Sequence, residues 1–580
     1  MKKIQITFAL LFLTGSLFAQ VSNEQVTVIA PFQPMVLDAH KINVTPQTID
    51  SALRPREARF DILSRKVVTS FGMDHIRPAR VAGEPLSKLS PLHVRGGFGN
   101  YATAYGELFY GSERSAQWQY GAHLKHNSSR GTFKNHEVPF DNSVNLIKLF
   151  GDYFGRKALV SANFYYDRQR YSAYGADVVF LDFWSNFKDD NYFKIVYNNT
   201  GGSIGFSDNN TEPNSLGYSG KLNIDVLQPN IIFLAGDKNE VSLNFTGNIH
   251  HTFDLGHPIF EQTVLGLDGT VDWHTWHLHR INDPKMFKFH PYGKLRFSGH
   301  DFSLGLRVNA FGTLDGDFFE REVKTEWQVI PTIHAKFNLI DNLLAIEFGL
   351  DGDVQYMTHK KMARINPFVF WWPMEAFSHP QRHWESYLGL NTMLSKTIDF
   401  ALKGRLVSYK NLMNFDVSTI SIRDYDGTIL SSISMPFFDP TYDTVNCFQL
   451  QADLNYHLDE KIAVSVMARG NFYDKDILYK PKYEANLAAR YNIQDKIILK
   501  TQLYFSSGTK YHDFSKIELI KPKLETFDPI IDWSIGAEYR FNRRWSAFLD
   551  VNNILNQRYY HWYNYRSFRT NFLIGATFNL

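Results

Sequence analysis

The sequence predicts an all-β protein: a transmembrane antiparallel β-barrel of about 22 strands, with 16–20 as the alternative count, and an extended N-terminal arm. Three observations predict this fold class. Apolar and polar residues alternate with a period of two, short turns alternate with long loops, and aromatic residues gather at strand ends. The strand-like runs after residue 91 are near the ~9 to 11 residues that a tilted crossing needs.

The chain divides into three parts. Residues 1–19 are interpreted as a secretory signal peptide, because two lysines precede an apolar stretch that ends at Ala19. A retained anchor helix is the alternative, but this stretch is shorter than the ~20 residues that a bilayer requires. Residues 20–90 are rich in proline and poor in glycine, which predicts an extended periplasmic or lumenal arm. Residues 91–580 are expected to form the barrel.

Alternation is strictest in IDWSIGAEYRF, residues 531–541. Ile531, Trp533 and Ile535 share one face of this strand, and Asp532 and Glu538 share the other. After the turn NRR a second alternating run follows, so the two runs predict an antiparallel hairpin. A soluble β-sandwich would also alternate, but it would divide the chain into domains of ~100 to 150 residues, and no linker interrupts the sequence after residue 92.

Turns and loops indicate which ends of the strands share a side of the membrane. Short turns are expected at 236–239, 298–301, 340–342, 395–397, 458–461, 494–496 and 542–544. Long irregular loops are expected at 168–190, 312–327, 357–386, 408–446 and 506–529. In outer-membrane barrels the short turns are periplasmic and the long loops extracellular.

Alternation also assigns polar side chains to the barrel interior. The residues expected to face the lumen are Arg469, Asn471, Glu484, Arg490, Lys500, Gln502, Asp532, Glu538 and Arg540. They either pair with one another and with water or hold a segment that fills the lumen. A barrel of about 22 strands needs such a filler to remain a barrier. The candidates are the arm, the loops 357–386 and 408–446, or a separate protein.

Bulk composition excludes several classes of function. The 61 basic and 59 acidic residues nearly cancel, which argues against a nucleic-acid partner. The single cysteine, Cys447, excludes an intramolecular disulfide framework and a multi-cysteine metal site. The sequence has no local signature of a hydrolase such as Gly-x-Ser-x-Gly or His-Glu-x-x-His, so we expect no enzyme, no cofactor and no catalytic residue.

Two residue clusters are candidate ligand sites. His277 and His279 share a strand face, and they could bind a metal if His251 lay across from them; His250 and His274 are nearby in sequence. Polar loop ends are the more common reason for such histidines, so no metal site is predicted. The glycines of VRGGFGN precede no helix, which excludes a phosphate cradle and indicates a sterically open first strand.

The C-terminal run carries a family resemblance. Residues 550–580 contain DVNNILNQRYY, a short aromatic loop and FRTNFLIGATFNL, which alternates to the final residue. This closely resembles the last two strands of TonB-dependent receptors of the Bacteroidota envelope. The resemblance implies a barrel of about 22 strands in the bacterial outer membrane and its lipid. The final strand must pair with the first, and its end is the expected handle for the outer-membrane insertion machinery.

A second, shorter stretch resembles the same family. VTVIAP looks like the box that contacts TonB, with Val26, Thr27, Val28, Ile29 and Ala30 as its residues; a β-prone start of the arm is the alternative. Receptors place a plug domain of well over a hundred residues after this box, whereas this chain has only about sixty before the barrel, so no normal plug is expected. The resemblance implies transport across the outer membrane, with TonB or a periplasmic or lipoprotein partner. The alternative is a non-transporting barrel that anchors an envelope complex.

Overall fold

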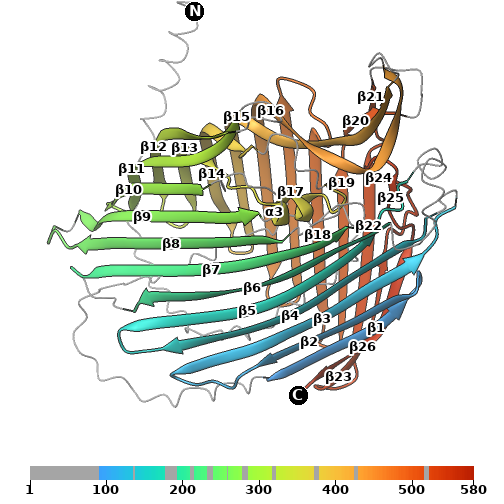
Figure 1. Ribbon diagram of the computed structural model, residues 1–580. Helices are drawn as coiled ribbons and strands as arrows, with labels where there is room; N and C mark the ends of the chain where they lie inside the picture. The colour runs from blue at the N-terminus through green and yellow to red at the C-terminus, as the bar shows by residue number, and fades with distance from the viewer. Residues whose placement is uncertain are drawn as a thin grey trace, which may run out of the picture. The chain divides into compact units, whose positions relative to one another are not determined.

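The computed structural model describes residues 90–134, 138–176, 193–209, 214–231, 239–257, 259–276, 285–315, 322–370, 378–423, 429–514 and 522–580. The expected signal peptide, and all of the expected arm except its last residue, lie outside these ranges. Within them, 22 antiparallel strands form one closed sheet (Figure 1). The predicted fold class is therefore confirmed, with the higher of the two predicted strand counts.

Each barrel strand pairs with the strands before and after it in the wall. The 22 strands are β1 (Leu92–Gly99), β2 (Thr103–Gly111), β3 (Trp118–Gly131), β4 (Phe140–Phe154), β5 (Ala158–Ser172), β6 (Lys194–Asp208), β7 (Leu216–Ile231), β8 (Glu240–Phe253), β9 (Phe260–Trp276), β10 (Lys285–Phe297), β11 (His300–Asp315), β12 (Glu322–Ile340), β13 (Leu344–Val354), β14 (Gln381–Ser395), β15 (Ile398–Arg423), β16 (Ile429–Leu458), β17 (Ile462–Tyr473), β18 (Tyr483–Ile493), β19 (Ile497–Ser506), β22 (Ile530–Arg540), β23 (Trp545–Asn552) and β26 (Asn571–Asn579).

Smaller elements lie in the connections. They are α3 (His359–Ile365), the pair β20 (Lys510–Asp513) and β21 (Lys523–Thr526), and the pair β24 (Tyr560–Trp562) and β25 (Tyr565–Arg566). In the described part of the chain, no helix is both long and apolar enough to cross a membrane.

The last strand closes the barrel on the first. β26 pairs with β1 from His93 opposite Asn579 to Gly99 opposite Leu573, and the amide of Leu580 donates to the carbonyl of Leu92 at 3.0 Å. An open edge in hydrocarbon would leave N–H and C=O groups unsatisfied, at several kcal/mol each. Closure of the ladder is therefore the reason that the alternating pattern continues to the end of the chain.

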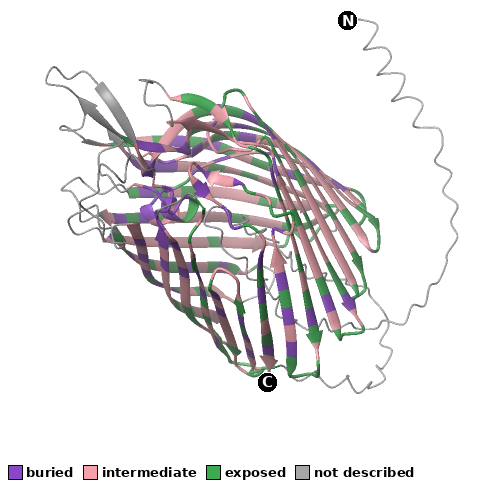
Figure 2. Ribbon diagram, turned by 90° about the vertical axis from the view of Figure 1, so that its right-hand side faces the viewer, coloured by how far each residue is buried: buried purple, intermediate pink, exposed green. Residues whose placement is uncertain are grey.

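Alternation along the strands separates the two faces of the wall (Figure 2). In β22, Ile531, Trp533 and Ile535 are exposed, whereas Asp532 and Ser534 between them are only partly exposed. α3 lies inside the cylinder (Figure 1), so the face that contacts it is the lumen side. The opposite face, with its exposed apolar side chains, is the face that a lipid bilayer would cover.

The two ends of the barrel differ in their connections. One end, here the short-turn end, carries the C-terminus and the connections 112–117, 155–157, 209–215, 254–259, 298–299, 341–343, 396–397, 459–461, 494–496 and 541–544. The other, the long-loop end, carries 100–102, 132–139, 173–193, 232–239, 277–284, 316–321, 355–380, 424–428, 474–482, 507–529 and 553–570.

Two of the expected connections differ in place or length. The expected turn 236–239 joins β7 to β8, so it belongs to the long-loop end; its residues 236–238 lie outside the described ranges. The expected loop 312–327 shortens to 316–321, because β11 and β12 pair as far as Asp315 opposite Glu322. The strand pairing of the wall therefore continues beyond the region in which the sequence alternates clearly.

The expected loop 408–446 is wrong. β15 and β16 form a long hairpin there, paired from Ile398 opposite Tyr456 to Arg423 opposite Ile429. Pro440 lies within the expected loop and pairs with Phe415 in this hairpin. β16 pairs with β17 only from Cys447 onward, so its outer half is an edge strand. Proline is tolerated at an edge because no neighbouring strand needs its missing N–H.

A buried charge cluster crosses the seam where the barrel closes. Arg95 on β1 donates from Nη2 to Oδ2 of Asp550 on β23 at 2.7 Å, and its Nη1 lies 4.0 Å from Oε2 of Glu538 on β22. Its guanidinium carbon lies 3.6 Å from the ring centroid of Phe548. Arg95 therefore reaches past β26 and links the first strand to the two strands beyond the seam.

Replacing Arg95 with methionine is expected to lower the free energy of unfolding by about 3–5 kcal/mol, because two carboxylates would remain buried without their cation. Urea titration in detergent micelles measures this change. The control is Arg469→Met, because the Arg469–Glu484 pair is longer, at 3.7 Å, and its side chains are more exposed. A loss in Arg95→Met no larger than in the control would contradict the role of the seam cluster.

Candidate functional site

The connection between β13 and β14, residues 355–380, enters the barrel and is here called the lumen loop. Its described residues are 355–370 and 378–380. The Gln355 amide donates to the Pro380 carbonyl at 2.8 Å and closes the base of the loop. α3 begins after Thr358, whose side chain accepts from the Lys361 amide at 3.2 Å, and it ends before Pro367, which cannot continue a helix.

Polar contacts fix α3 to one side of the wall. The Lys360 ammonium lies 2.9 Å from Oδ1 of Asp225 on β7, and it also donates to the Tyr165 hydroxyl on β5. The His359 amide donates to Oε2 of Glu240 on β8 at 2.8 Å. Glu240 is 1% exposed, so this carboxylate is removed from water by the loop that it binds. The helix therefore spans three strands of the lumen wall.

Burial shifts the pKa of two α3 side chains. It lowers the pKa of Lys360, and the Asp225 carboxylate opposes that shift. Burial also lowers the pKa of His359 well below its usual range. The Lys360–Asp225 contact is therefore one charged link between the helix and the wall that does not depend on a charged His359.

The segment after α3 crosses to other elements. The Tyr197 hydroxyl on β6 donates to the Pro367 carbonyl at 2.9 Å. The Phe368 ring stacks on Tyr565 of β25 with 3.6 Å between centroids. The backbone then pairs with the β15–β16 hairpin, since the Phe370 amide donates to the Phe438 carbonyl at 2.7 Å. The lumen loop therefore joins the helix-bearing wall to the hairpin and to the connection after β23.

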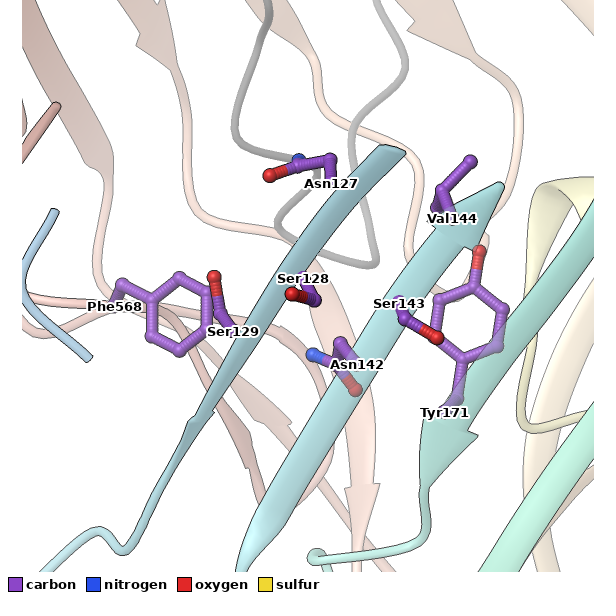
Figure 3. A pocket seen from close by; sticks show the side chains of 8 residues that line it. All are labelled: Asn127, Ser128, Ser129, Asn142, Ser143, Val144, Tyr171 and Phe568. Atoms are coloured by element: carbon purple, nitrogen blue, oxygen red, sulfur yellow. The ribbon is translucent and has the colours of Figure 1, made fainter. Parts of the chain in front are cut away.

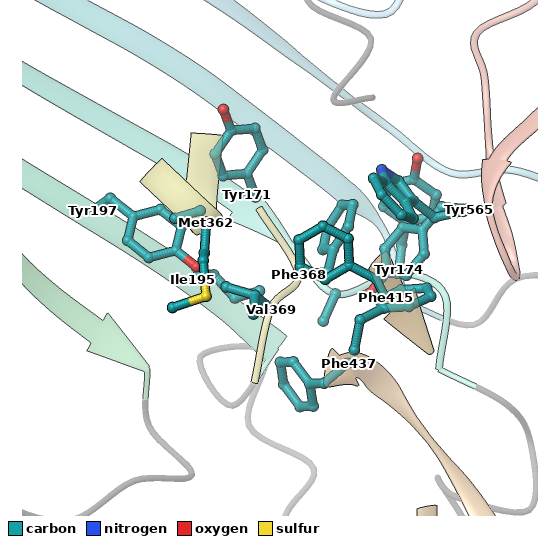
Figure 4. Packing of buried hydrophobic residues seen from close by; sticks show 14 of the residues in the cluster. Tyr171, Tyr174, Ile195, Tyr197, Met362, Phe368, Val369, Phe415, Phe437 and Tyr565 are labelled. Carbon is teal, nitrogen blue, oxygen red and sulfur yellow. The ribbon is translucent and has the colours of Figure 1, made fainter. Parts of the chain in front are cut away.

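These contacts belong to one apolar cluster at the long-loop end, here called the mouth cluster (Figure 4). It combines side chains from the lumen loop, the β15–β16 hairpin, the β24–β25 connection and strands β4 to β7. Its buried members are Val138, Phe140, Tyr171, Ala173, Tyr174, Ile195, Tyr197, Leu227, Met357, Met362, Ala363, Phe368, Val369, Met413, Phe415, Val417, Phe437, Phe438, Trp562, Tyr565 and Phe568. The lumen loop supplies its side chains from the inside of the barrel.

A small cavity borders the mouth cluster between β3, β4 and the 553–570 connection (Figure 3). Asn127, Ser129 and Asn142 give it a polar lining, and Tyr171 and Phe568 close it on the apolar side. Its volume of about 20 Å³ suits a single water molecule. It is too small to hold a transported solute.

The polar residues expected in the lumen lie on β17, β18, β19 and β22, on the face opposite the exposed apolar side chains. Among them, Glu484 pairs with Arg469, and Glu538 belongs to the seam cluster. Asn471 bonds to Gln449 and Pro481, and Gln502 bonds to Asn486. Asp532 accepts from Tyr559. The remaining expected residues are Arg490, Lys500 and Arg540.

These residues are therefore bonded mainly within their own part of the wall, while the lumen loop is held by β5, β6, β7 and β8. Sequence reasoning named the range 357–386 as a candidate filler but singled out none of the anchors. A usable local signal was Thr358 before HKKMARINP, which indicates a short capped helix in a loop.

The candidate TonB-contacting residues, Val26 to Ala30, lie outside the described residues, and so do His277 and His279. His251 pairs with Leu265 near the short-turn end, whereas His274 pairs with Ser242 near the long-loop end. Within the described ranges, no group of three or more histidine, cysteine, aspartate or glutamate side chains is arranged to hold a metal ion.

Comparison with solved structures identifies the fold. The ferric-catecholate import receptor Fiu from E. coli K12 superimposes with a TM-score of 0.59 at 11% identity, over 85% of this chain and 82% of that one. The copper transporter OprC gives 0.58 at 10% identity, over 85% and 81%. The FrpB iron transporter from Neisseria meningitidis gives 0.59 at 9% identity, over 85% and 83%.

No protein-family model matches the sequence, and no curated protein matches it either. The likeness to these import receptors and transporters is therefore one of fold. This likeness, together with the closed wall and its exposed apolar face, indicates the fold and the location of the protein. The chain is an outer-membrane β-barrel with the fold of TonB-dependent receptors.

Proposed function

We propose that the protein transports a solute across the outer membrane as a TonB-dependent receptor of Bacteroidota type that lacks a plug domain of normal size. In this proposal the lumen loop takes the place of a plug. The observation that carries it is the position of the loop inside the barrel, where it is joined to the lumen wall by non-covalent contacts, among them Lys360 to Asp225 and His359 to Glu240. Such hydrogen bonds can be exchanged for bonds to water or solute, which a covalent attachment does not allow.

Similarity of fold to an import receptor, a copper transporter and an iron transporter supports this assignment. None of these structures has a name that describes an enzyme, which agrees with the absence of a catalytic signature in the sequence. The proposal names no cargo. The partners it implies are TonB and, as an alternative, another periplasmic protein or a lipoprotein.

Energy input is proposed to enter through residues 26–30. Replacing Thr27 with proline is expected to abolish uptake that depends on TonB, because strand addition to a partner needs the backbone N–H that proline lacks. Growth on candidate nutrients and accumulation of labelled solute measure this effect. Thr27→Ser is the control, since it keeps the N–H. Uptake that persists in Thr27→Pro but disappears without TonB would place the contact elsewhere in the chain.

A second candidate function is favoured by the mouth cluster. Its dense aromatic packing, for example Phe368 on Tyr565, is compatible with a barrel that stays closed and anchors an envelope complex. Conductance steps from the full chain, or from a chain without residues 21–90, support a conduit. Silence of both forms is expected of the scaffold and also of a conduit that the lumen loop closes, so solute uptake separates the two functions. Accumulation of labelled solute that requires the protein supports the conduit, whereas loss of an envelope complex with unchanged uptake, in cells without the protein, supports the scaffold.

A further inference from the structure

The lipid-facing side of β3 to β5 changes from apolar to polar near the long-loop end. Leu124 on β3 and Ile147 on β4 are exposed and pair with each other, and Ile147 pairs with Tyr166 on β5. This row is the last apolar row on these strands. The next row on the same face lies two residues further along each strand, or about 7 Å outward.

Polar and basic residues replace the apolar ones from that row outward. His126 pairs with Asn145, which pairs with Arg168. One row further, Ser143 pairs with Arg170, and at the end of β3 Arg130 pairs with Asp141. No register shift interrupts these ladders, so Arg130, Arg168 and Arg170 share the lipid-facing side with Leu124 and Ile147.

Carboxylates balance only part of the positive charge in these outer rows. Arg170 forms an ion pair with Asp141. Within the ranges that the structure describes, neither Arg168 nor Arg130 forms an ion pair, although the backbone of Arg130 lies opposite Asp141. His126 is exposed and held in place by hydrogen bonds to Asn145 at 2.7 Å and Ser128 at 3.1 Å. We call Arg130, Arg168, Arg170 and His126 the arginine patch.

Another part of the wall has a different boundary. The outermost lipid-facing positions of β17, β18 and β19 are Phe472, Tyr483 and Phe505. Aromatic rings at that level form the usual interfacial girdle, which suits any lipid. On β3 and β5, arginines lie outward of the last apolar row, where β17, β18 and β19 carry such rings, so this side of the wall suits a different partner.

We propose that the arginine patch binds the phosphate groups of a phosphorylated glycolipid in the outer leaflet. The long-loop end faces the outside in barrels of this kind, so the patch lies at the head-group level of that leaflet. Guanidinium groups bind phosphate oxygens through paired charge-assisted hydrogen bonds, and they are easier to desolvate than ammonium groups. Arg130 and Arg168 supply the binding charge, and Asp141 holds Arg170 between them.

Purified full-length protein in nanodiscs tests the proposal, with lipid A carrying two phosphates as the probe. The double variant Arg130→Gln, Arg168→Gln is expected to bind this lipid at least about tenfold more weakly, because hydrogen bonds to a charged group contribute that much or more. Lipid A without its phosphates is expected to bind the wild-type protein as weakly as the double variant binds the intact lipid. The variant Arg168→Lys keeps the charge and is expected to retain an intermediate affinity.

The matched control is Arg543→Gln, Arg544→Gln in the turn at the short-turn end, which removes the same charge from the opposite rim. It is expected to leave lipid binding unchanged. Equal binding of intact lipid A by the wild type and the patch variant would overturn the proposal, as would equal competition by phosphatidylglycerol. A folding defect is excluded as the cause if the patch variant shows the same shift of its folded band as the wild type on unheated gels.

Discussion

Replacing Gly575 with valine is expected to abolish formation of the closed barrel. Gly575 on β26 pairs with Gly97 on β1 at the seam. A Cβ atom added at position 575 would lie 2.0 Å from the Gly96 carbonyl oxygen and 2.6 Å from the Phe548 ring. The carbonyl belongs to the closing ladder and cannot move away without breaking the pairing between the first and last strands.

Folded barrels resist unfolding in unheated detergent gels, so the fraction of protein with shifted mobility measures closure. The matched control is Ala576→Val, because Ala576 is the adjacent residue of the same strand and lies on the exposed face. Ala576→Val is expected to fold as the wild type does. A folded fraction in Gly575→Val equal to that of Ala576→Val would show that the seam can adapt to the added side chain.

The same seam limits what its sequence could show. The glycines of VRGGFGN indicated a sterically open strand, and this interpretation is wrong for Gly97: a Cβ there would lie 2.8 Å from the Ile574 carbonyl oxygen and 3.0 Å from the Phe548 ring. Phe548 is more than four hundred residues away in the chain. The glycines in the sequence indicate a place where no side chain fits, but the sequence does not show which distant ring fills that place.

The wall was the predictable part of the fold. Each wall strand is read from its own residues, since the bilayer outside and the polar lumen inside impose a period of two on every crossing. The β15–β16 hairpin escaped this logic. Outward of Cys447, which lies opposite Tyr473, β16 pairs with no further residue of β17, and Pro440 removes a donor without cost. Neither alternation nor proline content therefore marks a strand outside the bilayer.

The candidate site was predictable only as a range of residues. The sequence predicts a long loop between two alternating runs, and this loop is one of the predicted lumen fillers. The anchors were not visible, because Lys360 meets Asp225 and His359 meets Glu240 from strands distant in the sequence. In the sequence, an isolated Asp or Glu on the lumen face gives no indication of whether its side chain contacts water or a loop.

Replacing residues 356–379 with four glycine and serine residues is expected to convert a silent barrel into one that gives large conductance steps. The deletion removes α3 and Phe368, which reach across the lumen to Tyr165 on one side and Tyr565 on the other. A 22-stranded cylinder is wide enough that removing its filler opens an aqueous path. The strands themselves keep their pairing, since the base of the loop closes through Gln355 and Pro380.

A graded pair of point variants shows whether the polar anchors hold the loop in the blocking position. Lys360→Met removes the contact with Asp225 and is expected to produce brief, infrequent openings in planar bilayers. Lys410→Met is the matched control, because Lys410 pairs with Glu326 at 3.1 Å at an exposed position outside the lumen loop. It is expected to remain silent. If the loop deletion is as silent as the wild type, the barrier must lie elsewhere, and the lumen loop does not control passage through the barrel.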